Sequence, residues 1–201
     1  MGKLFYIMGK SASGKDTIYQ KLLKNPELDF RRLIIYTTRP IRDGERDGQE
    51  YFFVDEDRFQ SLKSDGKIIE DRGYETVYGL WRYFTADNMN LDSHDYLGIG
   101  TLESFVRLKE YYGEDKVCPV YIEVEDGERL KRAIAREETQ EMPKYEEMCR
   151  RFLADSQDFS EANIKAAGIS RRFQNMDFIT CLSDIEKYVK SVLYCNCSGS
   201  R

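Results

Sequence analysis

Short apolar runs of strand length recur along the chain, separated by longer stretches with a helical period. The first run, Leu-Phe-Tyr-Ile-Met at residues 4–8, ends at Gly9. Its length and its β-rich composition indicate a buried strand. Further core strands are expected at residues 33–36, 96–99, 117–124 and 178–181.

Between these runs, apolar residues return every three or four positions, which is the period of an amphipathic helix. The first helix places Ile18, Leu22 and Leu23 on one face and is expected to end near Pro26, because proline cannot continue a helix. Later helices are expected at residues 102–112, 129–136, 145–167 and 185–193. Strands that alternate with helices predict right-handed β-α-β units, and hence a mainly parallel sheet of the α/β class.

The pattern of apolar and polar residues changes at residue 37 and stays different to about residue 83. Turn signals at Asp43-Gly44 and Asp47-Gly48 accompany short runs at 51–54, 67–70 and 74–78 and a short helical stretch at 57–63. This mixture predicts a small mixed insert on the main sheet.

Composition and charge narrow the range of partners. The chain has 201 residues, 41% hydrophobic and 33% charged, with a net charge of −5. Proteins that bind duplex nucleic acid more often carry a basic excess, so no nucleic-acid partner is expected. No apolar run approaches the ~20 residues of a membrane span, so no membrane partner is expected either. The pattern identifies no protein partner.

The five cysteines are odd in number and scattered, which favours free thiols in a reducing cytoplasm. Cys195 and Cys197 stand close together but lack a second pair to complete a zinc site. We expect a frayed C-terminal tail there.

The glycine-rich segment after the first strand carries the strongest chemical signal, reading Gly9-Lys10-Ser11-Ala12-Ser13-Gly14-Lys15. Gly, four residues and Gly-Lys between a strand and a helix is the pattern of a phosphate-binding loop. Backbone N–H groups form an anion cradle there, the helix N-terminus adds its positive end, and Lys15 reaches the β- and γ-phosphates. The alternative is a tight turn with an exposed lysine. The residues expected to bind ATP are Gly9, Ser11, Ala12, Ser13, Gly14, Lys15, Asp16 and Thr17.

The position after the loop lysine is unusual. The standard loop has Ser or Thr there to hold Mg²⁺, whereas this chain has Asp16 followed by Thr17. A carboxylate is also a hard oxygen ligand for Mg²⁺, so Asp16 is the predicted metal ligand, directly or through water. Gly-Lys-Asp-Thr here resembles the loops of some deoxynucleoside-monophosphate kinases and phosphomevalonate kinases.

A second motif follows the predicted second strand and reads Thr37-Thr38-Arg39, then Arg42, Gly44-Glu45, Gly48 and Tyr51-Phe52-Phe53-Val54. Two arginines and a tyrosine hydroxyl can hold a doubly charged monophosphate, although isolated arginines often belong to a solvated turn. In order and spacing the segment resembles guanylate kinases. That resemblance implies that Arg39, Arg42 and Tyr51 grip the acceptor phosphate. It also implies that Glu70 reads the guanine edge and that Tyr78 supports the phosphate.

The resemblance implies a P-loop NTPase fold, in which a mainly parallel sheet is flanked by helices. We expect a single domain over residues 1–201, with a core at 1–36 and 96–195, an acceptor-binding insert at about 37–83 and a lid at about 137–144.

Three positions depart from the family pattern. Ile35 and Leu80 stand where the family has hydroxyl side chains that bond the base. An Asp-x-Asp pair is replaced at the end of the third core strand, where this chain reads Gly98-Ile99-Gly100. A buried polar edge left unpaired costs ~1–3 kcal/mol per group, so the acceptor can be GMP or another phosphorylated molecule.

The lid is expected to supply positive charge. Arg129, Arg132 and Arg136 lie three and four residues apart on one helix face, and Arg151 follows the charged break. By resemblance, Arg136 and Arg151 are the predicted catalytic arginines, together with Lys15. For Arg129 and Arg132 an ordinary charged helix face is the favoured interpretation.

These residues together predict an ATP- and Mg²⁺-dependent nucleoside-monophosphate kinase with GMP as the first acceptor. Two alternatives stay open: the same scaffold with a different acceptor, and a guanylate-kinase-like binding module with weak catalysis.

Overall fold

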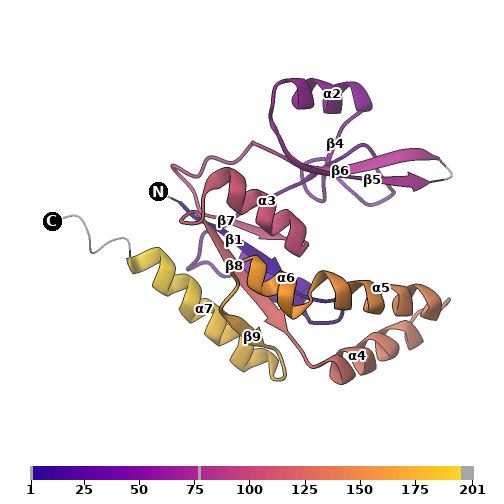
Figure 1. The fold of residues 1–201 in the computed structure, drawn as a ribbon, viewed down its shortest axis with the longest axis vertical. Helices are drawn as coiled ribbons and strands as arrows, with labels where there is room; N and C mark the ends of the chain where they lie inside the picture. The colour runs from indigo at the N-terminus through magenta and orange to yellow at the C-terminus, as the bar shows by residue number, and fades with distance from the viewer. Residues whose placement is uncertain (1, 77, 196–201) are drawn as a thin grey trace.

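Five parallel strands form the central sheet in the order β2-β7-β1-β8-β9 (Figure 1). The structure is a computed structural model and describes residues 2–76 and 78–195. The strands span β1 Leu4–Met8, β2 Arg31–Arg32, β7 Tyr96–Ile99, β8 Val117–Glu123 and β9 Arg172–Gln174. The predicted strand at 4–8 and the predicted strand at 96–99 are confirmed at both ends.

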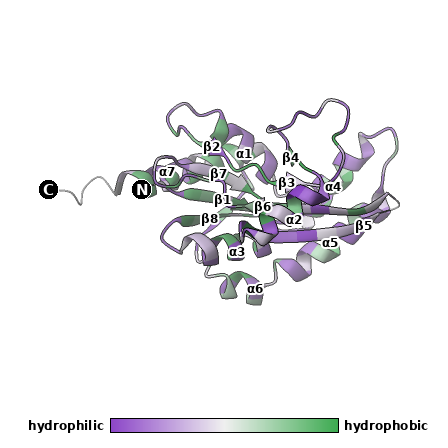
Figure 2. Ribbon diagram, turned by 90° about the horizontal axis from the view of Figure 1, so that it is seen from above, coloured by the Kyte–Doolittle hydropathy of each residue, from purple (hydrophilic) through white to green (hydrophobic). Residues whose placement is uncertain are grey.

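Helices cover both faces of this sheet. Every side chain of β1 is buried, and much of β1 and β8 is coloured as hydrophobic in Figure 2. Since successive residues of a strand point to opposite faces, both faces of the sheet are packed. Tyr6 packs in a cluster with Phe105 and Ile164, whereas Phe5 packs in a cluster with Ile18 and Ile185. The helices are α1 Lys15–Leu23, α3 Leu102–Tyr112, α4 Asp126–Glu138, α5 Tyr145–Asp158, α6 Glu161–Ala166 and α7 Phe178–Cys195. The helix predicted at 102–112 is confirmed.

A second, smaller sheet with the order β4-β3-β6-β5 lies at one end of the molecule together with α2 (Figure 1). Its elements are β3 Tyr36–Thr37, β4 Phe52–Phe53, α2 Glu56–Ser64, β5 Ile68–Thr76 and β6 Gly79–Ala86. It has its own core, in which Phe59 and Phe84 are fully buried. This sheet overlaps the predicted insert, and the runs predicted at 67–70 and 74–78 fall largely within one long strand, β5.

The strand predicted at 33–36 is wrong. The core strand there is Arg31–Arg32, and Tyr36–Thr37 belongs to the smaller sheet. β2 is an edge strand whose two arginines are exposed, so it needs no apolar run of its own.

The strand predicted at 178–181 is also wrong, because those residues open α7. The N–H of Thr180 donates to Asp177 Oδ1 at 2.8 Å, which caps this turn. Cys181, Ile185 and Val189 are then buried at a helical period. The last core strand is the short β9 instead.

The single helix predicted at 145–167 is two helices, because α5 ends at Asp158 and α6 begins at Glu161. Phe159 leaves the helical path and stacks on Tyr121 in the core, with ring centroids 5.7 Å apart. Ser160 then caps α6 through the N–H of Asn163.

Cys118, Cys149 and Cys181 are free thiols. Of the predicted frayed tail, Cys195 is the last residue of α7, whereas Cys197 lies outside the described residues. Among the helices that the structure describes, none is both long and apolar enough to cross a membrane.

Candidate active site

The loop between β1 and α1 has the backbone conformation of an anion cradle. Gly14 has φ of 85° immediately before α1, and an added Cβ would lie 2.4 Å from Asn175 Nδ2. Ala12 also has a positive φ, 61°, which residues other than glycine rarely adopt. The buried Ser13 hydroxyl has no hydrogen-bond partner among the described residues. This strained loop at a helix N-terminus fits an anionic ligand that would complete its hydrogen bonding.

Lys15 and Asp16 begin α1 at the mouth of this loop. The two side chains form an ion pair of 3.8 Å, and the Asp16 side chain is 84% exposed. A carboxylate this exposed is accessible to a hydrated cation. The metal-ligand role of Asp16 stays a prediction.

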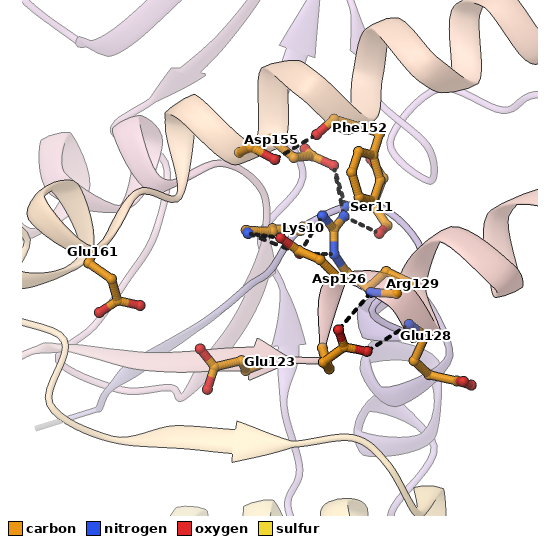
Figure 3. A network of polar contacts seen from close by, with 12 residues as sticks. Lys10, Ser11, Glu123, Asp126, Glu128, Arg129, Phe152, Asp155 and Glu161 are labelled. Atoms are coloured by element: carbon orange, nitrogen blue, oxygen red, sulfur yellow. Dashed lines mark hydrogen bonds and ion pairs between the residues drawn. The ribbon is translucent and has the colours of Figure 1, made fainter.

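Side chains from the C-terminal half hold the loop, and Figure 3 shows one of them, Arg129, beside Ser11. Ser11 O accepts from Arg129 Nη1 at 3.0 Å, and Ser13 O accepts from Asn175 Nδ2 at 2.8 Å. Asn175 is held in turn through its own carbonyl by Arg132 Nη2 at 3.0 Å. The solvated-face interpretation of Arg129 is therefore wrong, because its side chain is 1% exposed. Asn175 was missed because nothing in its local sequence connects it to the loop.

The buried Arg39 organises the predicted acceptor segment. Its side chain is 3% exposed and donates to both Glu45 oxygens, at 2.8 and 3.0 Å. The guanidinium carbon lies 5.6 Å from the Tyr51 ring centroid and 5.5 Å from that of Phe53. Its Nε is buried without a hydrogen-bond partner among the described residues. The hydrogen bonds to Glu45 raise the pKa of Arg39 above its ordinary value, so it stays cationic.

Arg42 has an exposed side chain, and its backbone N–H donates to Glu45 Oε2 at 2.8 Å. Glu45 therefore joins the two predicted acceptor arginines. Tyr51 lies beside Arg39, and burial raises the pKa of its hydroxyl, which stays protonated as a donor. The structure brings Arg39, Arg42 and Tyr51 to one place, and their roles stay predictions.

The Glu45 carboxylate makes the free energy of unfolding sensitive to pH in the acid range. The hydrogen bond from Arg39, and after it the one from the Arg42 N–H, lowers the pKa of Glu45 below its ordinary value of 4.5. The native carboxylate thus binds a proton more weakly than the unfolded one. Its contribution to stability is complete above about pH 4.5 and is lost as the pH falls through the lowered pKa.

This dependence predicts a smaller effect of acid on the Glu45→Gln variant. Between pH 6 and pH 3 its free energy of unfolding, measured by urea denaturation, should fall by less than that of the wild type. Equal losses would contradict the assignment.

Glu70 lies on β5 and is buried. Thr85 Oγ1 donates to Glu70 Oε1 at 2.8 Å, and Arg72 Nε is 3.3 Å from Oε2. Arg72 and Tyr74 of the same strand line a cavity of about 550 Å³ together with residues of α3, α5 and α6. A carboxylate has about four acceptor positions, so Glu70 retains capacity for a base edge.

Tyr78 lies between β5 and β6, in the turn of their hairpin, and 82% of its surface is exposed. Its ring stacks on that of Trp81, with the ring centroids 6.1 Å apart. Among the described residues no hydrogen bond or ring contact joins Tyr78 to Arg39 or Arg42. Its support of the acceptor phosphate stays a prediction.

Tyr6 of β1 fills the space beside Gly98 and Gly100. An added Cβ at Gly98 would lie 2.7 Å from Tyr6 Cδ2, and one at Gly100 would lie 2.0 Å from Tyr6 Oη. Burial raises the pKa of the Tyr6 hydroxyl. A neutral phenol thus occupies the place where side chains at 98 and 100 would begin.

This contact predicts a compensating pair of substitutions. We expect Gly100→Ala to lower the free energy of unfolding by about 1–3 kcal/mol through overpacking against the Tyr6 hydroxyl. Tyr6→Phe removes that oxygen, so the double variant Tyr6→Phe/Gly100→Ala should be more stable than the sum of the single effects predicts. Urea denaturation of all four proteins measures this coupling, and additive losses would contradict it.

The two predicted lid arginines face the phosphate loop. Arg136 near the end of α4 and Arg151 on α5 line one cavity of about 220 Å³ with Ser11. Lys144, which precedes α5, lines the same cavity. The structure therefore brings these cations to the loop from a distant part of the sequence, although their catalytic roles stay predictions.

The chain is similar to known proteins over most of its length. A family model described as guanylate kinase matches residues 1–191. A guanylate kinase of Anaplasma phagocytophilum (strain HZ) is 27% identical over 193 residues, which cover 93% of this chain and 82% of that protein. One of Wolbachia pipientis wMel is 29% identical over 192 residues, covering 95% and 87%. The crystal structure of guanylate kinase from Anaplasma phagocytophilum shares the fold, with a TM-score of 0.63 at 21% identity over 94% of this chain and 85% of that one.

Proposed function

Because the chain belongs to the guanylate kinase family, we propose that it transfers the γ-phosphoryl group of ATP to GMP, producing ADP and GDP. The observation that carries the proposal is the group formed by Arg39, Arg42 and Tyr51: Glu45 bonds the Arg39 guanidinium and the Arg42 N–H, and Tyr51 lies beside Arg39. Two arginines and a tyrosine hydroxyl held together in this way suit a dianionic phosphate.

On the donor side, the loop from Gly9 to Lys15 and the N-terminus of α1 hold the ATP phosphates through N–H groups other than those of Ser11 and Ser13, which donate to Asp155 and Lys10. Lys15 neutralises charge on the β- and γ-phosphates as the bond to the leaving oxygen weakens. Positive φ, as at Ala12 and Gly14, is typical of backbone turns that bind anions.

Mg²⁺ fits this donor site. Among the described residues no group of three potential metal-binding side chains occurs, which suits a cation held mainly by phosphates, water and one carboxylate. Asp16 would supply that carboxylate, with the Thr17 hydroxyl next to it. When bound, the cation neutralises charge on the transferring phosphoryl group.

On the acceptor side, Arg39, Arg42 and Tyr51 orient the GMP phosphate for in-line attack. Glu70 accepts hydrogen bonds from the guanine edge. The lid arginines Arg136 and Arg151 then close over the transferring group and exclude water. Ile35 and Leu80 offer the base no hydroxyl, so Glu70 carries more of the discrimination here.

The test is a coupled ADP-release assay with Mg²⁺ and ATP against GMP, dGMP, AMP, CMP, UMP and dTMP. We expect GMP to give the highest kcat/KM, and Glu70→Gln to raise the KM for GMP about 10- to 100-fold while the KM for ATP stays within about twofold. Preference for another monophosphate would reassign the base pocket around Ile35 and Leu80. Absence of turnover with all six, despite ATP binding, would favour a binding module.

The cytoplasm is the proposed location, since free thiols at Cys118, Cys149 and Cys181 suit a reducing compartment.

A further inference from the structure

Both backbone polar groups of Ser11 are bonded by side chains of the two lid helices. Its N–H donates to Asp155 Oδ2 of α5 at 2.7 Å, and its C=O accepts from Arg129 Nη1 of α4 at 3.0 Å (Figure 3). The two side chains also approach each other, with Arg129 Nη1 3.6 Å from Asp155 Oδ2. We name this arrangement of Arg129, Asp155 and Ser11 the Ser11 clamp.

The clamp is rigid because Arg129 is fixed on every side. Its Nε and Nη2 donate to Asp126 Oδ1 at 3.0 and 2.8 Å. Its guanidinium carbon lies 4.4 Å from the Phe152 ring centroid. A planar guanidinium that is stacked on a ring and bonded along its edges has one orientation. The contacts of Arg129 therefore link α4, α5 and the phosphate loop at a single point.

The predicted catalytic arginines lie on the same two helices, at fixed spacings from the clamp. Arg136 follows Arg129 by seven residues on α4, or about two turns, and Arg151 precedes Asp155 by four residues on α5, or about one turn. These spacings place each arginine on the helix face of its clamp residue. Ser11, Arg136 and Arg151 accordingly line the same cavity.

We propose that Arg129 and Asp155 are positioning residues that set where Arg136 and Arg151 meet the transferring phosphoryl group. The inference rests on the proposed function. The clamp residues bond the backbone of the loop and act through the lid arginines, without touching the reacting atoms. The clamp fixes one end of α4 and α5 on the loop, so closure of the lid pivots about Ser11.

The kinetic test uses Asp155→Asn, which keeps the size of the side chain and removes its charge, and Arg129→Lys, which keeps the charge and removes the planar fork. Asp184→Asn on α7 is the matched control, because Asp184 forms an exposed pair with Lys187. We expect each clamp variant to lower kcat about 10- to 100-fold, because small misplacement of a charged group costs that much. The KM for GMP should stay within about twofold, and Asp184→Asn should match the wild type. Unchanged kcat in both clamp variants would overturn the inference.

A double-mutant cycle separates positioning from simple destabilisation. If the clamp acts through Arg136, then Arg136→Ala should lower kcat by a smaller factor in the Asp155→Asn background than in the wild type. Equal factors in the two backgrounds would show that the clamp only supports the fold, and would overturn the proposal.

Amide hydrogen exchange provides a readout that does not depend on turnover. Asp155→Asn should accelerate exchange in peptides that span the loop, residues 9–17, and the lid, residues 136–151, whereas Asp184→Asn should change neither. Faster exchange in the loop alone would overturn the link to the lid. A wild-type protein without GMP kinase activity would refute the proposed function, while this exchange measurement would still decide whether the clamp couples loop and lid.

Discussion

Lys15→Ala is expected to lower kcat for phosphoryl transfer by at least about 10²- to 10³-fold, the usual loss when one charge-stabilising group is removed from a transition state. Lys15 begins α1 beside the loop, and its side chain forms a long ion pair with Asp16, at 3.8 Å. Its amino group is therefore available to the β- and γ-phosphates. The fold should survive, because the loop is held by Arg129, Asp155 and Asn175, none of which contacts Lys15 through a hydrogen bond.

The measurement is the coupled ADP-release assay under saturating ATP and GMP, with thermal unfolding to check folding. Lys21→Ala, on the exposed face of the same helix, is the matched control and should retain turnover within about twofold. A folded Lys15→Ala protein with wild-type kcat would refute the assigned mechanism.

Arg39→Met should have the second large effect, lowering kcat/KM for GMP by about 100-fold through loss of a charged contact worth about 3 kcal/mol. It should also lower stability, because Glu45 loses the partner that bonds both of its oxygens. The KM for ATP should change little, since Arg39 belongs to the smaller sheet region and not to the phosphate loop.

Arg42→Met provides the comparison for this variant. Arg42 is exposed and contributes only its backbone N–H to Glu45, so its loss should weaken GMP binding with little effect on thermal unfolding. If Arg39→Met destabilised the protein without changing the KM for GMP, Arg39 would be a structural residue of the turn and not an acceptor ligand.

The central strands could be predicted from the sequence because they are buried on both faces. β1 and β7 appear as short continuous apolar runs, and both were located at the correct residues. The edge strands could not be found in this way. β2 consists of two exposed arginines, and β9 buries fully only Phe173, so neither has the apolar pattern that the prediction relied on.

The loop and acceptor motifs were visible because their residues are contiguous. The burial of Arg129 could not be predicted for a different reason. In the sequence of a charged helix, an arginine that will be buried cannot be distinguished from one that will be exposed. Its burial depends on Phe152 and Asp155, which come from another helix and are adjacent only after folding. A charged residue on an otherwise amphipathic helix can therefore be evaluated only once its tertiary neighbours are known.

Because Tyr6 packs against Gly98 and Gly100, the residue types at these three positions should change together during evolution. A lineage that acquires a side chain at 100 must first lose the phenol at 6, and a lineage that acquires the phenol must first lose that side chain, because the two would occupy one volume. Relatives should accordingly fall into two groups, one with a large aromatic at 6 and glycines at 98 and 100, the other with a smaller residue at 6 and side chains at those positions. Introducing the family's Asp-x-Asp pair at positions 98 and 100 of this chain would therefore also require replacement of Tyr6.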